Sequence, residues 1–428
     1  DWFQNYLKDK NPGKDYFISV DKNFDISKVV RPRDHDLIQK FKLDHIEKNL
    51  WCTFSKDQVD LNFKNPEVLL GFIDILFHCL KNGINIFRLD AVGFIWKENG
   101  TECLNLPEAH EVIKLIRKVL DSLNQKSIIV TETNLPRKEN LSYFGNNDEA
   151  NWIYNFSLPP LLIHAFLFEN SLYLNRWSKK LPNLKAGNSY LNFIASHDGI
   201  GMRPVEGILN KNIIDNLFSR LKKNGSKFSY RKVKDKTKRV YEANITIFDA
   251  LYKSDFDKEG KFFLERYFSA HAIMIAFEGI PAIYLNSMFG NSNDESKYII
   301  TGNNRDVNRY KWSEKNILNL LKDKKSKESI IYNLINKLLK IRRKQKAFHP
   351  NALRSQIYLG NEIFCFKRTS LDKKQIIISI SNLTSKIIIP KLNKKYLKWK
   401  NLIDPQIYKK NKGFLILKPF ETIWLSNI

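Results

Sequence analysis

Cysteine and histidine are scarce in this chain of 428 residues, which contains four cysteines and eight histidines. The cysteines lie far apart, and no pair has the spacing of a zinc site or a dithiol motif, so we expect reduced thiols in a cytoplasmic protein. The histidines show no metal-binding spacing either. The sequence therefore predicts neither a metal site nor another cofactor.

Long uninterrupted apolar runs are also missing. Asp74 interrupts the run 69–80 and Glu278 interrupts the run 272–285, so no stretch approaches the roughly 18 apolar residues of a membrane span. Hydrophobic residues still make up 43% of the chain and aromatic residues 13%. This composition supports a large core and excludes a wholly disordered protein. We expect a folded protein that does not enter a membrane.

Acidic residues are few compared with basic ones, because 71 lysines and arginines stand against 45 aspartates and glutamates, a formal net charge of +26. Such an excess can favour nucleic-acid binding. The basic residues are spread along the whole chain, however, and no nucleic-acid-binding motif is present. The densest basic runs, 222–238 and 396–412, are typical of solvated loops. We therefore do not expect a nucleic-acid partner.

The middle of the chain, from about residue 65 to 346, alternates short apolar runs with segments of helical periodicity. This alternation predicts parallel strands joined by crossover helices, an α/β fold. The expected helices include 107–124 and 262–278. The apolar runs that we assign to strands are 84–90, 127–132, 152–158, 190–198 and 281–287.

The tail follows a different pattern. A long helix, 326–347, precedes it, and from about residue 354 short runs with alternate apolar residues predict an antiparallel β domain. Within this domain, residues 414–428 are expected to form a hairpin-like pair. Residues 1–64 and 199–261 fit neither pattern. Because long loops in a compact domain usually carry function, we expect both to cover an active-site face.

These patterns divide the chain into three parts. We predict a loop-rich inserted domain at 1–64 and a catalytic domain at 65–350, with the excursion 199–261. A C-terminal β domain follows at 351–428.

Three acidic residues, Asp90, Glu132 and Asp198, stand at the C-terminal ends of three predicted strands. In parallel α/β barrels the active site lies at that face. A single acidic residue at a strand end often only begins a turn, but three in equivalent places favour a shared function. Paired carboxylates suit glycosyl transfer, in which one attacks the anomeric carbon and the other moves the proton. A separation of about 5–5.5 Å gives retention of configuration.

Two neighbouring residues support this interpretation. Arg88 lies two positions before Asp90, so both side chains point to the same side of the strand, where Arg88 would keep Asp90 ionised. His197 adjoins Asp198 and offers a hydrogen-bond donor to sugar hydroxyls. The alternative for His197 is a buried structural histidine.

Several segments resemble the α-amylase family, glycoside hydrolase family 13. FRLDAVGF (87–94), VTETN (130–134) and ASHDGIG (195–201) resemble three of its four signature motifs. RPRDH (31–35) and NNRDVNR (303–309) resemble its sucrose phosphorylase branch. The resemblance extends over essentially the whole chain. It implies a (β/α)8 TIM barrel with an inserted domain after the third strand and a C-terminal β-sandwich.

The resemblance also implies a role for each matching residue. Asp90 would be the nucleophile, Glu132 the general acid/base and Asp198 the carboxylate that stabilises the transition state. The residues that would bind substrate are Arg88, His197 and Arg309 in the glucose subsite and Arg33 near the phosphate or acceptor.

One family motif is absent, an Asp-to-Asn-His segment at the end of the third barrel strand. In relatives it falls just before a WFQ-like segment, and WFQ occupies positions 2–4 here. Because only five strands are recognisable, we expect the first three barrel strands to be missing. Open strand edges would then leave residues 1–428 inactive and prone to aggregation.

The resemblance implies a retaining glycoside phosphorylase that transfers glucosyl from sucrose or a related α-glucoside to inorganic phosphate, giving α-glucose 1-phosphate. One alternative is a phosphorylase for glucosylglycerate or sucrose 6-phosphate, which the segment FEGIPAIYLNSMFGNSND (277–294) favours. Others are a hydrolase of sucrose-type α-glucosides and an inactive remnant.

Overall fold

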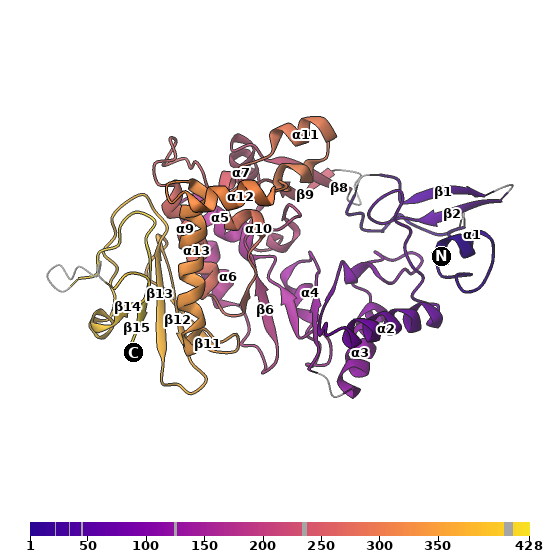
Figure 1. Cartoon of the computed structure of the whole chain (residues 1–428), viewed down its shortest axis with the longest axis horizontal. Coiled ribbons are helices and arrows are strands. Elements are labelled where there is room, and N and C mark those ends of the chain that lie inside the picture. The colour runs from indigo at the N-terminus through magenta and orange to yellow at the C-terminus, as the bar shows by residue number, and fades with distance from the viewer. Residues whose placement is uncertain (22, 34, 44–45, 124–125, 233–237, 406–413) are drawn as a thin grey trace. The chain divides into compact units, whose positions relative to one another are not determined.

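The computed structural model describes the chain apart from residues 22, 34, 44–45, 124–125, 233–237 and 406–413 (Figure 1). The chain forms two compact units, one of residues 1–153 with 229–241 and one of residues 154–228 with 242–428. Parallel strands alternate with helices, and an antiparallel sheet follows at the C-terminal end, so the predicted fold class is confirmed.

Parallel strands form the centre of the first unit. β3 (Ile86–Leu89) pairs with β4 (Ile128–Thr131), and β4 pairs with the start of β5 (Trp152–Tyr154). The helices α2 (Pro66–Lys81) and α3 (Pro107–Ser122) flank β3 in the chain, and α3 confirms the predicted helix 107–124.

The edge of this sheet is exposed at β3. Ile86 is 48% exposed, whereas Ile129 and Val130 of β4 are buried. Leu70 and Ile75 on α2 are also exposed. Among the described residues of this unit, β3 therefore presents an open edge next to apolar side chains.

The N-terminal part of the first unit has more regular structure than its sequence suggests. It contains α1 (Trp2–Leu7) and an antiparallel hairpin of β1 (Ile38–Leu43) and β2 (Ile46–Trp51). The ring of Trp2 packs on Gly71 of α2, where an added Cβ would lie 2.7 Å from a ring carbon. Glycine at this position is what lets α1 approach α2.

The second unit contains two parallel strands, β6 (Ser189–Asn192) and β10 (Ile280–Pro281). The strand predicted at 281–287 is wrong beyond its start, because the chain enters α10 (Leu285–Met288) there. A short apolar run has no periodicity that separates strand from helix.

Helices of this unit match their prediction more closely. The runs expected at 262–278 and 326–347 form α9 (Phe263–Ala276) and α13 (Lys327–Arg343). Other helices are α4 (Arg137–Ser142) in the first unit, and α5 (Leu158–Leu167), α6 (Leu172–Lys179), α11 (Glu295–Thr301) and α12 (Glu314–Lys322) in the second.

The excursion at 199–261 contains regular elements rather than one long loop. They are β7 (Ile200–Gly201), α7 (Lys211–Lys223), β8 (Lys227–Lys232), β9 (Lys238–Asn244) and α8 (Ile247–Ala250). β7 pairs antiparallel with β9, opposing Gly201 to Glu242. Parts of the basic runs 222–238 and 396–412 lie outside the described residues.

The C-terminal sheet is antiparallel, with the order β11-β12-β13-β15-β14. Its strands are β11 (Leu353–Ile357), β12 (Ile363–Thr369), β13 (Ile376–Asn382), β14 (Lys400–Asn401) and β15 (Thr422–Ser426). The hairpin predicted within 414–428 is wrong. Instead, β15 pairs with β13. Leu417 pairs with Ile388, and both side chains belong to one apolar core.

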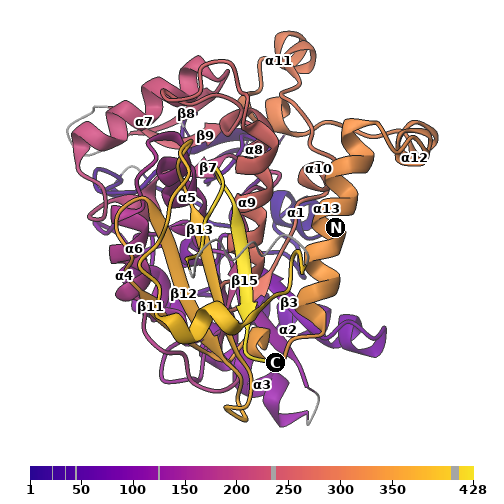
Figure 2. The same cartoon turned by 90° about the vertical axis from the view of Figure 1, so that its left-hand side faces the viewer.

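Helix α9 packs against α13 and against β13 and β15 (Figure 2). Its C-terminal end leaves backbone carbonyls without helical partners. Arg368 of β12 donates to the carbonyls of Ala276 and Phe277 at 2.9 and 2.7 Å, and Arg342 of α13 donates to that of Gly279 at 2.6 Å. Burial lowers the pKa of Arg368 to about 9, yet this guanidinium keeps its carbonyl partners. Arginines from two elements thus cap this helix.

Candidate active site

Asp90 and Glu132 leave the ends of neighbouring parallel strands. Leu89 of β3 stands opposite Thr131 of β4, and each acidic residue comes directly after one of this pair. The backbone N–H of Glu132 donates to the carbonyl of Leu89 at 3.0 Å, which extends the pairing by one step. Because neighbouring strands lie roughly 4.8 Å apart, the two carboxyl groups begin at a spacing suited to work on one bond.

Arg88 contacts Asp90 along the same strand. Its Nη1 lies 2.5 Å from Oδ1 of Asp90. The Asp90 side chain is 71% exposed and that of Arg88 is 34% exposed, so Asp90 keeps most of its surface open to a reacting molecule. The structure therefore brings these two predicted site residues together at the strand end.

The backbone of Ala91 holds Glu132. Ala91 has φ of 48°, in the left-handed region that residues with a Cβ seldom adopt, and it begins the 3-10 turn η1 (Val92–Phe94). In this conformation its N–H donates to Oε2 of Glu132 at 2.9 Å. The residue next to one carboxylate therefore orients the other. Sequence reasoning missed this contact, because a backbone donor leaves no side-chain signal.

Asp198 lies in the loop between β6 and β7 of the second unit. Its Oδ1 is 2.6 Å from Nη1 of Arg305 and 3.4 Å from Nη2 of Arg309, and its Oδ2 is 3.5 Å from Nε2 of His197. The Asp198 side chain is 24% exposed. His197 is 58% exposed, so it is not the buried structural histidine of the alternative interpretation.

Arg305 and Glu242 are functional candidates that sequence reasoning did not identify. Arg305 makes a bidentate pair with Glu242, from Nη2 to Oε1 at 2.6 Å and from Nε to Oε2 at 3.1 Å. The Glu242 side chain is only 4% exposed, so solvent screens this ion pair little. The motif NNRDVNR carries both arginines, and a second guanidinium four residues before Arg309 was the available signal.

The motif NNRDVNR also forms hydrogen bonds with the backbone at Asp198. Its 3-10 turn η3 (Asn304–Asn308) places Asn308, whose Nδ2 donates to the carbonyl of Asp198 at 2.8 Å. Arg309 donates through Nε to the carbonyl of His197 at 2.7 Å. Tyr284 donates to the carbonyl of Asn308 at 3.1 Å, and burial raises the pKa of its hydroxyl, which stays protonated.

Arg33 lies in the first unit between two aromatic rings. Its guanidinium carbon is 5.8 Å from the ring centroid of Phe54 and 5.9 Å from that of Tyr241, and its Nη1 donates to the carbonyl of Pro32 at 3.0 Å. Aromatic faces attract a cation and fix the plane of a guanidinium. The two rings therefore favour a guanidinium at this position.

The predicted site residues are distributed over both units. Asp90, Glu132, Arg88 and Arg33 belong to the first unit; Asp198, His197 and Arg309 belong to the second. Within the residues that the structure describes, no group of histidine, cysteine and acidic side chains is placed to hold a metal. No described helix has the length and apolar character that crossing a membrane requires.

Comparison with known proteins identifies the family. The model of the α-amylase catalytic domain matches residues 1–199. Glucosylglycerate phosphorylase from Escherichia coli (strain K12) is 37% identical over 100% of this chain and 75% of its own length. The chain belongs to the α-amylase family. Within this family it lies in the sucrose phosphorylase-like branch and is an enzyme.

Further members of the α-amylase family support this placement. Glucosylglycerate phosphorylase from Spirochaeta thermophila is 36% identical over 91% of the chain and 66% of its own length. Sucrose phosphorylase from Agrobacterium vitis is 26% identical over 81% of the chain and 70% of its own length. The chain therefore spans 66–75% of these relatives.

A solved structure supports the fold assignment. Sucrose 6F-phosphate phosphorylase from Thermoanaerobacter thermosaccharolyticum superposes with a TM-score of 0.75 at 21% identity, over 89% of this chain and 76% of that one. The parallel strands with their helices thus belong to the barrel fold of the α-amylase family, followed by a C-terminal β domain.

Proposed function

We propose that this protein is a retaining phosphorylase that converts glucosylglycerate and inorganic phosphate into α-glucose 1-phosphate and glycerate. The observation that carries the proposal is the similarity to glucosylglycerate phosphorylases, 37% over the whole chain for the Escherichia coli protein. The sucrose phosphorylase from Agrobacterium vitis reaches 26% over 81% of the chain. This difference favours glucosylglycerate over sucrose, the donor that the sequence motifs first suggested.

In the first step, Asp90 acts as the nucleophile. Its carboxylate oxygen bonds to the anomeric carbon of the glucosyl group, and the bond to the glycerate oxygen breaks. Glu132 gives its proton to that oxygen, so glycerate leaves as an alcohol. Arg88, whose Nη1 lies 2.5 Å from Oδ1 of Asp90, orients the attacking carboxylate.

In the second step, inorganic phosphate takes the place of glycerate. Glu132 removes a proton from the phosphate, a phosphate oxygen bonds to the anomeric carbon, and the bond to Asp90 breaks. Two inversions give α-glucose 1-phosphate with retained configuration. The N–H of Ala91, which donates to Oε2 of Glu132 at 2.9 Å, orients this general base.

Arg33 is the candidate for binding the acceptor. Glycerate and phosphate are both anions, and a guanidinium binds carboxylate and phosphate equally well in bidentate geometry. One arginine beside the rings of Phe54 and Tyr241 can bind each anion in turn. This exchange of one anion for another suits glucosylglycerate as donor better than sucrose, whose fructose is neutral.

Asp198 is the candidate for binding the ring hydroxyls of the glucosyl group. Arg305 and Arg309 hold its carboxylate, and Asn308 holds its backbone. A carboxylate fixed in this way accepts hydroxyl hydrogen bonds without having to reorient, and preorganisation of this kind lowers the barrier.

The test is the phosphate-dependent release of glucose 1-phosphate by the purified protein. We expect kcat/KM for glucosylglycerate to exceed that for sucrose by at least about 10²-fold, since a neutral leaving group forms no charge-assisted pair with the acceptor-site guanidinium. Asp90→Asn is the inactive control. Higher kcat/KM with sucrose would identify a sucrose phosphorylase, free glucose formed without phosphate would identify a hydrolase, and no turnover of either donor would identify an inactive remnant.

A further inference from the structure

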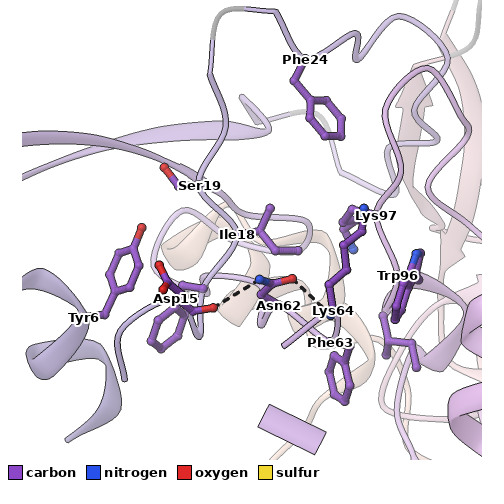
Figure 3. Close-up of a pocket in the computed structure, with 12 residues that line it drawn as sticks. Tyr6, Asp15, Ile18, Ser19, Phe24, Asn62, Phe63, Lys64, Trp96 and Lys97 are labelled. Atoms are coloured by element: carbon purple, nitrogen blue, oxygen red, sulfur yellow. Dashed lines mark hydrogen bonds between the residues drawn. The ribbon is translucent and has the colours of Figure 1, made fainter. Parts of the chain in front are cut away.

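The first unit contains a cavity of about 310 Å³ (Figure 3). It lies between the N-terminal segment of this unit and residues 95–97, in the loop that follows β3. Neither Asp90 nor Glu132 is among the residues that line it. Its lining includes Tyr6, Asp15, Ser19, Lys64, Trp96 and Lys97.

The two sides of the cavity differ in chemistry. In Figure 3 the hydroxyls of Tyr6 and Ser19 and the carboxylate of Asp15 gather on one side, and the ring of Trp96 lies on the other. Burial raises the pKa of the Tyr6 hydroxyl, which therefore remains a hydrogen-bond donor. A polar wall facing an aromatic ring matches a pyranose, which has hydroxyls around its edge and C–H groups on its faces.

The charges around the cavity disfavour an anion. Two lysines line it, but Lys64 lies 2.7 Å from Glu98 and Lys97 lies 2.9 Å from Asp60. These pairs neutralise the lysines. With both lysines paired, the carboxylate of Asp15 repels phosphate or glycerate.

We propose that this cavity binds one neutral hexose unit, at a site separate from the catalytic carboxylates. The volume of about 310 Å³ lies at the lower end of the range for small-molecule sites, which suits a single sugar ring. Ile95 and Trp96 line the cavity and follow η1, which Ala91 precedes. A bound sugar therefore steadies the loop that carries Asp90 and the N–H donor to Glu132.

The experiment measures equilibrium dialysis of radiolabelled D-glucose against the whole protein at concentrations around ~1 mM, where a small open site is half-occupied. The proposed site is distinguished by glucose binding that Asp15→Asn weakens and that Asp198→Asn does not change. We expect Asp15→Asn to weaken this binding at least about tenfold. Asp15 has φ of 63°, and asparagine tolerates that region, so the change alters the carboxylate and not the backbone.

Asp9→Asn is the matched control. Asp9 also has a left-handed φ, 52°, in the same unit, and its side chain is 67% exposed beside Lys14. It does not line the cavity, so glucose binding should not change. Tyr6→Phe is a second variant that removes one hydroxyl and keeps the ring.

Two results would overturn the proposal. One is glucose binding that is equal in Asp15→Asn, Tyr6→Phe and the unchanged protein. The other is displacement of the Asp15-dependent glucose by inorganic phosphate, because an anion would then be the preferred ligand. The proposed phosphorylase activity is measured separately as glucose 1-phosphate release, so either proposal can fail while the other stands.

Discussion

The two groups of candidate catalytic residues are held in different ways. Asp90 is 71% exposed and pairs with Arg88, two positions away on the same strand. Asp198 is 24% exposed and is held by Arg305 and Arg309, more than a hundred residues along the chain. The first carboxylate is thus oriented by local geometry, and the second by a tertiary clamp.

The energetics of the two arrangements differ accordingly. An exposed pair such as Arg88–Asp90 contributes about 0–1 kcal/mol to stability, because solvent screens it. The pair of Arg305 with the buried Glu242 should matter more for stability, because removing one partner of a buried pair costs about 3–5 kcal/mol. We therefore expect substitutions near Asp90 to affect turnover alone, and substitutions near Asp198 to affect turnover and stability together.

The largest effects should come from the two carboxylates themselves. Asp90→Asn and Asp198→Asn should each lower kcat/KM about 10⁴-fold, the scale of losses at groups that act on the reacting bond. The two variants should differ in the intermediate, because in the proposed mechanism only Asp90 forms a bond to the sugar. Mass spectrometry of a trapped glucosyl enzyme should find the label on Asp90, and a label on Glu132 would reverse the assigned roles.

The clamp gives the next largest effect. Arg305→Gln should lower kcat/KM about 10²-fold, because Asp198 loses its 2.6 Å partner, and misplacing a positioned group costs about that much. Urea unfolding should show a loss of about 3 kcal/mol, because the buried Glu242 loses its bidentate contact with Arg305.

A double variant separates these two effects of the clamp. Adding Glu242→Gln to Arg305→Gln should restore stability while kcat/KM stays low. If activity returned together with stability, Arg305 would be only structural. Arg88→Gln is the matched change in the other group and should leave stability within about 1 kcal/mol.

Arg33 tests whether the acceptor site belongs with the Asp90 group in the first unit. Arg33→Ala should lower phosphorolysis about 30-fold and leave hydrolysis of the same donor within about threefold, because the lost charge-assisted hydrogen bonds act on phosphate and not on the glucosyl group. The measurement compares glucose 1-phosphate with free glucose. Equal losses in both reactions would mean that Arg33 only supports the fold.

Acid should lower the stability of the second unit through two buried histidines. Burial lowers the pKa of His164 and of His271, both in the second unit, from 6.5 to about 4. Because the unfolded chain takes up these protons first, the stability from the neutral rings is complete above pH 6.5 and declines as the pH falls toward 4. At pH 5 the free energy of unfolding should be about 2 kcal/mol lower for each of the two rings than at neutral pH.

Urea unfolding between pH 7 and 4.5 measures this dependence. His271→Gln should flatten it, and His78→Gln on exposed α2 is the control. A pH dependence that His271→Gln leaves unchanged would contradict the role of that ring.

Periodicity and motif explain which parts could be predicted from the sequence. β3, β4, α3, α9 and α13 were predicted nearly to their ends, because their apolar spacing is set locally. Arg88 beside Asp90 follows from two-residue alternation in a strand. The bidentate pair of Arg305 and Glu242 could not be found in this way, since it joins a 3-10 turn to a strand far away in the chain.

Backbone conformation and pairing partners explain the remaining misses. The left-handed Ala91 is a backbone feature that alanine itself does not signal. The pairing of Leu417 with Ile388 could not be predicted either. Several apolar runs of this domain are similar in sequence, so the sequence does not indicate which of them pair.

The arginine cap on α9 has a consequence for how the protein unfolds. Arg342 and Arg368 come from α13 and from the C-terminal sheet, and both donate to carbonyls at residues 276–279. Separating the sheet from the helix would break these hydrogen bonds before water could replace them. The guanidinium groups would then lack acceptors, and the carbonyls would lack donors. Partial opening at this boundary is therefore costly, and the C-terminal sheet should melt together with α9 in one calorimetric transition rather than as an independent domain.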